Sequence, residues 1–212
     1  METMEIFNNF ILPKTQKVFF DFVSSSAFPY RFQDVHNPDY GVAQKRYYQS
    51  DSLSDFVSDS YNSTIYATPK QLTHHLFMKD GDEEQKSPHY PILTPFLESI
   101  YSKVGDFDLL RAKVNVTMPD PRFDAYTSQV PHIDLKYDDG NELPHVVFLY
   151  YINDSDGPTY FYNKELEVVS SVAPIMGTCV MFDGGTLHAG SNPNSTPFRY
   201  ALNINIQLKE SK

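Results

Sequence analysis

The second half of the chain carries short runs of alternating apolar and polar residues, separated by turn-forming residues. Over about 100 residues, this pattern predicts strands at 109–118, 126–135, 145–152, 158–162, 166–173, 178–182 and 198–208. The intervening turns, rich in Asp, Asn, Gly and Pro, lie at 138–141, 153–157, 183–185 and 191–194. Strands this closely spaced leave no room for the helices of a βαβ fold. We therefore expect a mainly β (α+β) chain built on a double-stranded β-helix, the cupin-like jelly roll.

The first 107 residues have a different character, because two segments show helical spacing of apolar residues. Residues 13–24 begin with Pro13, which suits a first helical turn, and residues 93–104 end just before Gly105. The apolar positions are Val18, Phe19, Phe22 and Val23 in the first segment and Leu93, Phe96, Leu97 and Ile100 in the second. We expect both helices to pack on one sheet of the jelly roll.

The remaining N-terminal segments carry weaker signals. Residues 73–79 are predicted to be a strand and residues 81–84 a turn. Residues 27–65 are rich in Tyr, Asp, Ser and Asn and are predicted to be loops with short strands. Such a segment forms either a lid over a binding site or plain surface loops, and plain surface loops are the commoner case.

The overall charge restricts the possible partners. The chain has 17 Lys and Arg against 27 Asp and Glu, a net charge of −10, and this repels the phosphate backbone of nucleic acids. General nucleic-acid binding is therefore disfavoured. A hydrophobic content of 41% predicts a globular chain, and the sequence gives no indication of its oligomeric state.

Cysteine usage and hydropathy predict a soluble cytoplasmic protein. Cys179 is the single cysteine, so no disulfide forms within the chain, and its apolar neighbours indicate a buried thiol in a reducing compartment. The N-terminus lacks the features of a signal peptide. The longest apolar run, Val146 to Ile152, is too short to span a bilayer, so no membrane association is expected.

The last predicted strand, 198–208, has two different faces. One face carries Tyr200, Leu202, Ile204, Ile206 and Leu208, and the other carries Arg199, Ala201, Asn203, Asn205 and Gln207. The polar face points either to solvent or into a polar cavity between two sheets. Both arrangements produce the same alternation.

Three residues form a candidate metal site. His132 and Asp134 are two residues apart, so on a strand both side chains lie on one face, and His188 follows 54 residues later beside a glycine-rich turn. Two imidazoles and one carboxylate are the ligands of the facial triad that binds non-haem iron(II) and leaves positions open. Zinc also binds such a set. However, the chain has no His-Glu-x-x-His helix and no evident general base for hydrolysis.

Four sequence blocks resemble one known family. They are VPHIDL, FLYYINDSDGPTYFY, APIMGTCVMFDGGTLHAGSNP and PFRYALNINI, and they cover about residues 108–208. The chain is similar in these blocks to the 2-oxoglutarate- and iron(II)-dependent oxygenases of the prolyl-4-hydroxylase-like group. The segment NNFILPKTQKVFFDF, followed by FPY, looks like the start of small bacteriophage and bacterial members.

The resemblance implies roles for individual residues. His132, Asp134 and His188 correspond to the iron ligands, and Arg199 corresponds to the partner of the distal 2-oxoglutarate carboxylate. Tyr151 is similar to a family tyrosine that reaches the same carboxylate, although Tyr150 competes with it as the inward-facing residue. Further residues expected to line the cosubstrate pocket are Asn203, Asn205 and, more weakly, Asn115. No catalytic residue beyond the metal ligands is expected.

The implied activity is hydroxylation of a prolyl or other peptidyl residue, with a free small molecule or a modified base as the open alternatives. Iron(II), 2-oxoglutarate and O₂ are the implied cofactor and cosubstrates, with ascorbate as a candidate reductant and succinate and CO₂ as products. The cytoplasm would be that of a bacterium or of a phage-infected host cell. One departure affects the substrate side, because the family's GGET turn is DGPT here, at residues 156–159.

Two non-enzymatic alternatives remain at this stage. The chain is either a cupin-like metal-binding module without turnover or a virion or assembly protein with a structural metal. The presence of all three ligands and of Arg199 argues against the first alternative. Structural metal sites are usually closed by four protein ligands, and the three candidates found here argue against the second. The expected organisation is one oxygenase domain over residues 1–212, with a helical and loop support region at 1–107 and a jelly-roll catalytic core at 108–208.

Overall fold

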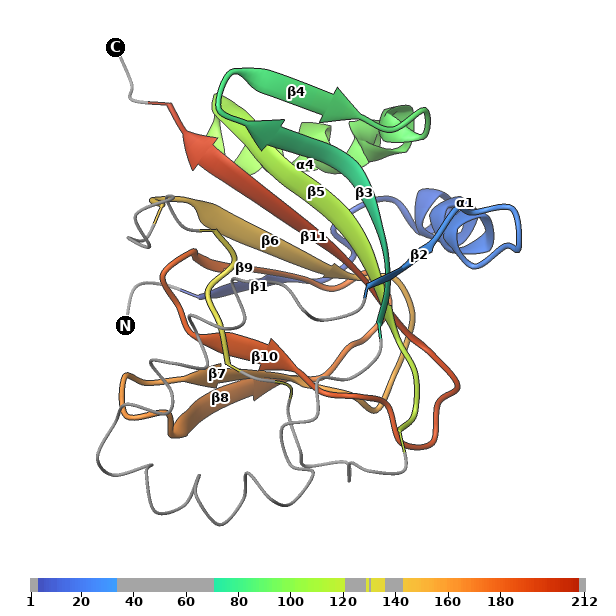
Figure 1. Cartoon of the computed structure of the whole chain (residues 1–212), viewed down its shortest axis with the longest axis vertical. Coiled ribbons are helices and arrows are strands. Elements are labelled where there is room, and N and C mark those ends of the chain that lie inside the picture. Colours follow the sequence, from blue (N-terminus) through green and yellow to red (C-terminus); the bar gives the residue numbers. More distant parts are fainter. Residues whose placement is uncertain (1–3, 34–70, 121–128, 130, 136–142, 210–212) are drawn as a thin grey trace.

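Two antiparallel β-sheets make up the centre of the molecule (Figure 1). The computed structural model describes residues 4–33, 71–120, 129, 131–135 and 143–209. Within these residues the larger sheet has the strand order β1-β9-β6-β11-β5-β3-β2, with β4 paired to β3, and the smaller sheet has the order β10-β7-β8. Two packed antiparallel sheets confirm the predicted mainly β jelly roll.

The strand boundaries agree with most of the predicted ranges. The larger sheet contains β1 (Glu5–Phe7), β2 (Arg31–Gln33), β3 (Gln71–Asp80), β4 (Glu83–Lys86), β5 (Phe107–Thr117), β6 (Val146–Tyr151), β9 (Cys179–Asp183) and β11 (Arg199–Leu208). The smaller sheet contains β7 (Thr159–Tyr162), β8 (Val168–Val172) and β10 (His188–Gly190). Strands β1, β4 and β10 were not predicted, and the turn expected at 81–84 is already strand from Glu83 onward.

The strand predicted at 126–135 is wrong for the residues that the structure describes there. Residues 131–135 form no named strand, and His132 makes only an isolated antiparallel bridge with His188. Pro131 explains part of the difference, because it has no N–H to donate to a ladder. Residues 126–128 and 130 lie outside the described part of the chain, as do residues 34–65 of the segment 27–65 that is a candidate lid.

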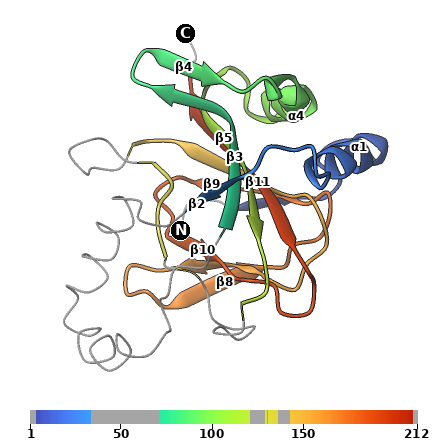
Figure 2. The ribbon, with the colours of Figure 1, turned by 45° about the vertical axis from the view of Figure 1, so that its right-hand side comes forward.

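Two α-helices cover one face of the larger sheet (Figure 2). They are α1 (Pro13–Val23) and α4 (Thr94–Val104), which follows the 3-10 turn η1 (Tyr90–Leu93). Phe96 and Ile100 of α4 are fully buried in the same apolar layer as Phe19 and Val23 of α1, which confirms the predicted packing on one sheet. No helix in the described ranges is long and apolar enough to cross a lipid bilayer.

The apolar stripe of α1 differs from the prediction at one position. Phe19 and Val23 are buried as expected, but the side chain of Val18 is 62% exposed. The buried face is completed by Gln16, whose Nε2 donates a hydrogen bond of 2.8 Å to the carbonyl oxygen of Ile11. The polar side chain can therefore be buried because its donor finds a backbone acceptor.

The two faces of the central strands contact different layers. On β6, Phe148 and Tyr150 lie in the helix-covered layer, whereas Leu149 and Tyr151 face the smaller sheet. The layer between the sheets contains Val147, Leu149, Tyr151, Phe161, Val172, Val180, Phe182 and Ala201. Cys179 is fully buried, as predicted.

The polar face of β11 lies inside the molecule. Arg199, Asn203 and Asn205 are 5%, 4% and 0% exposed, while Leu202 and Ile204 on the opposite face contact the helix-covered layer. The alternation left open by the sequence is therefore the signature of an internal polar cavity. Burying such groups is costly unless each finds a partner, so this face points to function.

Candidate metal centre and adjoining cavity

The three predicted metal ligands lie together. His188 begins β10, and its backbone N–H and carbonyl exchange hydrogen bonds of 3.0 Å with those of His132. This bridge brings two loop-borne residues, His132 and Asp134, onto the edge of the smaller sheet. One donor atom from each of the three side chains lies within 4.8 Å of the others, so small rotations let a single ion bind all three.

The chemistry of these side chains fits a divalent transition metal. Nδ1 of His188 lies 3.0 Å from the carbonyl oxygen of Thr186, which leaves Nε2 facing the carboxylate of Asp134 at 3.8 Å. Metal-binding histidines usually fix their second nitrogen in this manner. Burial lowers the pKa of His188, and a lower pKa favours the neutral imidazole that a metal needs.

Three side chains hold the carboxylate of Asp134. Arg111 of β5 donates from Nη2 to Oδ1 at 2.6 Å, and Asn203 and Asn205 donate from Nδ2 to Oδ2 at 2.8 and 3.0 Å. Burial alone would raise the pKa of Asp134, but Arg111 and the two histidines hold it well below its usual value. The carboxylate is therefore ionised and oriented before any ligand binds.

A cavity of about 60 Å³ adjoins the triad between the two sheets. Its lining residues include His132, Asp134 and His188 of the triad as well as Arg199. Of the other predicted pocket residues, Asn115 and Asn203 line this cavity. Asn205 and Tyr151 are not among the lining residues, and each instead contacts a residue that is.

Arg199 is a buried cation whose charge is not neutralised by the described chain. Its Nε donates to the carbonyl oxygen of Gly157 and its Nη2 to Oγ1 of Thr159, both at 2.8 Å. Among the described residues, no carboxylate lies within ion-pairing distance of this guanidinium. Gly190 leaves space beside it, because a Cβ there would lie 3.3 Å from Nη1. An anionic ligand that enters the cavity would supply the missing partner.

The competition between the two adjacent tyrosines is decided by the sheet register. Tyr151 pairs with Ala201 on the inner face, and its hydroxyl donates to Oγ1 of Thr159 at 2.9 Å. Thr159 thus accepts from both Tyr151 and Arg199. Tyr150 packs in the helix-covered layer, where its hydroxyl finds no partner within the described residues.

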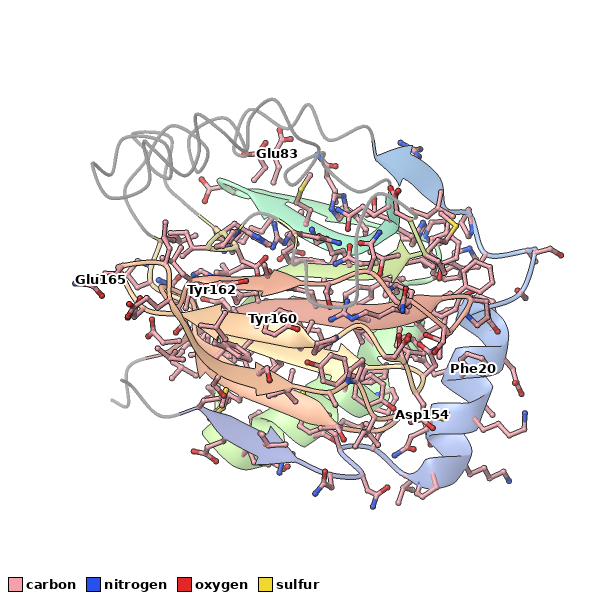
Figure 3. All side chains as sticks on the ribbon, turned by 90° about the horizontal axis from the view of Figure 1, so that it is seen from below. Phe20, Glu83, Asp154, Tyr160, Tyr162 and Glu165 are labelled. Carbon is pink, nitrogen blue, oxygen red and sulfur yellow. The ribbon has the colours of Figure 1, made fainter. Side chains whose placement is uncertain are left out.

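Strand β7 presents alternate residues to the cavity and to the outside. Thr159 and Phe161 are buried, whereas Tyr160 and Tyr162 are half-buried on the outer face of the smaller sheet, as seen from below in Figure 3. This alternation directs the hydroxyl of Thr159 toward Arg199.

The DGPT turn has a defined structural task. The carboxylate of Asp156 accepts hydrogen bonds from the backbone N–H groups of Asn194, Ser195 and Thr196 and from the hydroxyls of the last two. These hydrogen bonds, which we call the Asp156 clasp, hold the turn at 156–159 against the loop that leads into β11. Because the next residue, Gly157, is the backbone acceptor for Arg199, the clasp also positions the guanidinium.

Sequence reasoning missed Arg111, Lys113 and Thr159. The first two lie on β5, where Arg111, Lys113 and Asn115 share one face and buried Ala112 and Val114 share the other. This is the same alternation that identified the inner face of β11, so the signal was present. Thr159 carries no comparable signal, since its role depends on contacts with distant residues.

Comparisons with known proteins support the fold. No model of a known protein family matches the sequence, and no curated protein is similar to it in sequence. The structure is similar to SnoN, a non-haem alpha-ketoglutarate-dependent epimerase from nogalamycin biosynthesis, with a TM-score of 0.57 and 9% identity over 97% of this chain and 77% of that chain. It is also similar to HygX from Streptomyces hygroscopicus, solved with nickel and 2-oxoglutarate bound, with a TM-score of 0.54 and 11% identity over 97% and 83%.

A third similar structure is an oxidoreductase of the 2OG-Fe(II) oxygenase family from Burkholderia pseudomallei. Its TM-score is 0.51 at 14% identity, and the match covers 65% of this chain and 66% of that chain, just under two thirds of its length. At such identities the comparisons establish the fold, which is the double-stranded β-helix of the 2-oxoglutarate oxygenases. The expected resemblance in fold is confirmed.

Proposed function

We propose that this protein is an iron(II)- and 2-oxoglutarate-dependent dioxygenase. One observation carries the proposal: a buried guanidinium, Arg199, shares a cavity with His132, Asp134 and His188 and has no carboxylate partner among the described residues. A dicarboxylate anchored on Arg199 would reach the metal centre with its other end. A 2-oxo acid suits this position, because it can chelate a metal that keeps open coordination sites.

The number of ligands favours catalysis over a structural metal. The described residues supply three donors, whereas structural zinc sites are usually closed by four protein ligands. Two histidines and one carboxylate on one side of an ion leave the cavity side free for organic ligands and O₂. These features argue against the structural-metal and binding-module alternatives.

Bound iron(II) would supply the redox chemistry that converts 2-oxoglutarate and O₂ to succinate and CO₂ while the second oxygen atom enters the substrate. The protein's own residues bind the cosubstrate and orient the candidate metal ligands. Arg199 holds the distal carboxylate, Tyr151 supports it through Thr159, and Asn203 and Asn205 keep Oδ2 of Asp134 in place. Asn115 lines the cavity between the two ends. His188 is buried and His132 and Asp134 are half-buried, which limits the access of water and so side reactions.

The proposed substrate is a prolyl or other peptidyl residue or a small molecule. The sequence resemblance to the prolyl-4-hydroxylase-like group favours the first. The structural neighbours favour the second, because SnoN belongs to nogalamycin biosynthesis and HygX was also solved with hygromycin B. Both candidates fit an enzyme with no general preference for nucleic acids.

Uncoupled turnover tests the proposal without knowledge of the substrate. The protein is incubated with iron(II), 2-oxoglutarate, O₂ and ascorbate, and succinate is quantified. We expect slow succinate formation that is lost in His132→Ala, Asp134→Ala and His188→Ala. Equal succinate formation by all three variants and the wild type would contradict the assignment.

A further inference from the structure

We propose that Lys113 binds an oxyanion of the substrate, a carboxylate or a phosphate, at the metal end of the cavity. This inference rests on the proposed function and names the chemical class of the substrate. Lys113 lines the cavity, but the proposed anchoring of the cosubstrate at Arg199 does not require it.

The sheet register places Lys113 beside the metal centre and away from Arg199. Lys113 of β5 pairs with Asn203 of β11, which donates to the ligand Asp134. Arg199 pairs with Thr117, four residues further along β5 and so about 13 Å away along the strand. Both cations line the same cavity, one at each end.

Among the described cations at this cavity, Lys113 is the one whose charge neither an ion pair of the protein nor the cosubstrate would neutralise. Arg111 is paired with Asp134, and Arg199 would be paired with the distal carboxylate of 2-oxoglutarate. Within the described residues, the side-chain ammonium of Lys113 makes no hydrogen bond and no ion pair, although the side chain is half-buried. Asp134 attracts the ammonium only from beyond ion-pairing distance, so a ligand would give this half-buried group a direct counter-ion.

The charges around the cavity support an anionic ligand. Lys113 and Arg199 line the cavity, and Arg111 lies behind it, paired with Asp134, which is the single carboxylate among the lining residues. Iron(II) and the 2-oxoglutarate dianion would cancel each other. Counted over the described residues, an excess of two positive charges would therefore remain, in a chain whose overall charge is −10. The local field selects a negatively charged group even though the whole protein repels one.

The protonation of Lys113 agrees with this role. Burial and the neighbouring Arg111 lower the pKa of Lys113 to about 8, while Asp134 acts in the opposite direction. The ammonium form therefore still predominates at neutral pH. An anion bound at this position would favour the charged form further and raise the pKa.

The position also assigns the oxyanion to the substrate and not to the cosubstrate. A 2-oxo acid anchored at Arg199 extends toward the metal, and Lys113 is at the opposite end from that anchor. A ligand that binds Lys113 would therefore lie beside the triad and apart from the anchor at Arg199. We assign this position to the molecule that is hydroxylated.

The test uses simple anions on the loaded protein. Cobalt(II) replaces iron, 2-oxoglutarate is saturating, and line broadening is measured for inorganic phosphate by ³¹P NMR and for acetate by ¹H NMR. We expect saturable broadening in the wild type, at least tenfold weaker anion binding in Lys113→Met, and recovery in Lys113→Arg. The matched control, Lys79→Met, changes an exposed lysine of β3 and should behave as the wild type.

Calorimetry of 2-oxoglutarate binding to the cobalt protein separates the two ends of the cavity. We expect Lys113→Met to change this affinity by less than twofold. A large loss would assign Lys113 to the cosubstrate and overturn the inference. Equal anion broadening in Lys113→Met and the wild type would mean an adventitious ion only and would also overturn it. Failure of the wild type to bind 2-oxoglutarate would instead contradict the proposed function.

Discussion

The guanidinium of Arg111 binds the oxygen of Asp134 that does not face His188. Arg111 Nη2 lies 2.6 Å from Oδ1, while Oδ2 lies 3.8 Å from Nε2 of His188. Oδ1 is thus bound by Arg111, whereas Oδ2, which accepts from Asn203 and Asn205, is the oxygen that faces His188 and would meet a metal. Arg111 itself is fixed by a hydrogen bond of 2.9 Å from Nε to Oδ1 of Asn205.

Arg111→Met should weaken metal binding about 10- to 100-fold, because partners of this kind hold a ligand in its binding orientation. The measurement is an anaerobic calorimetric titration with iron(II). Arg111→Lys keeps the charge but cannot reproduce the separate hydrogen bonds to Asp134 and Asn205, so its metal affinity should lie between those of the wild type and Arg111→Met. Lys17→Met removes an exposed ion pair with Asp21 and serves as the control. Unchanged metal affinity in Arg111→Met would show that Asp134 needs no such support.

Arg199→Met should weaken 2-oxoglutarate binding with little effect on metal affinity. Loss of a charge-assisted bidentate pair costs roughly 2–4 kcal/mol, which corresponds to roughly 30- to 1,000-fold in the dissociation constant. Calorimetry with the metal-loaded protein provides both affinities. Tyr151→Phe removes only the hydroxyl that supports Thr159, so we expect a change of no more than about tenfold. Wild-type affinity in Arg199→Met would place the dicarboxylate elsewhere.

Gly157→Ala should destabilise the fold and the anchor at Arg199 together. A Cβ at this position would lie 2.6 Å from the carbonyl oxygen of Ser191 and 2.9 Å from backbone atoms of Asn192 and Pro193. Backbone atoms cannot rotate away, so we expect a loss of about 1–3 kcal/mol in the free energy of unfolding and weaker 2-oxoglutarate binding.

Urea unfolding and calorimetry measure both effects of Gly157→Ala. The control is Gly81→Ala, in a turn with a φ of 57°, where no heavy atom lies within 4 Å of the added Cβ. It should cost stability through its backbone alone and leave ligand affinity unchanged. Normal stability in Gly157→Ala would mean that the turn containing Gly157 can move away from residues 191–193 at no cost.

The Asp156 clasp should make stability depend on pH in the acid range. Partial burial raises the pKa of Asp156, but hydrogen bonds from Ser195 and Thr196 hold this pKa below its usual value of 3.8. Stabilisation by the clasp is therefore complete above about pH 4 and declines as the pH falls toward the folded-state pKa. Asp156→Asn should lose roughly 1–2 kcal/mol at pH 7 and progressively less below pH 4. Urea unfolding at pH 7, 4 and 3 measures the difference, and a pH-independent difference would argue against the clasp.

Local sequence patterns predicted the strands and helices but not all the contacts that build the site. Strand β11 was recognisable because it alternates strictly, and α4 because its apolar residues recur at helical spacing. Strand β6 is buried on both faces, so its sequence has no alternation that separates Tyr150 from Tyr151. Only the pairing of Tyr151 with Ala201 decides which ring faces the cavity.

Sequence analysis predicted the three candidate metal ligands that the structure brings together, but it missed Arg111 and Thr159, which support the site. The spacing of His132, Asp134 and His188 predicts a metal site without any knowledge of the fold. Arg111 contacts a residue 23 positions away, and this pairing depends on how β5 lies beside β11. Long-range contacts of this kind follow from sheet topology, which local periodicity does not encode.

The central claim is that one cavity binds iron(II) and 2-oxoglutarate together. Anaerobic titration of the protein with iron(II) and then with 2-oxoglutarate tests it directly, by following the weak visible charge-transfer band of the chelate. We predict a band that saturates with both ligands in the wild type, fails to develop in His188→Ala, and requires far more 2-oxoglutarate in Arg199→Met. Metal binding without any band in the wild type would contradict the account.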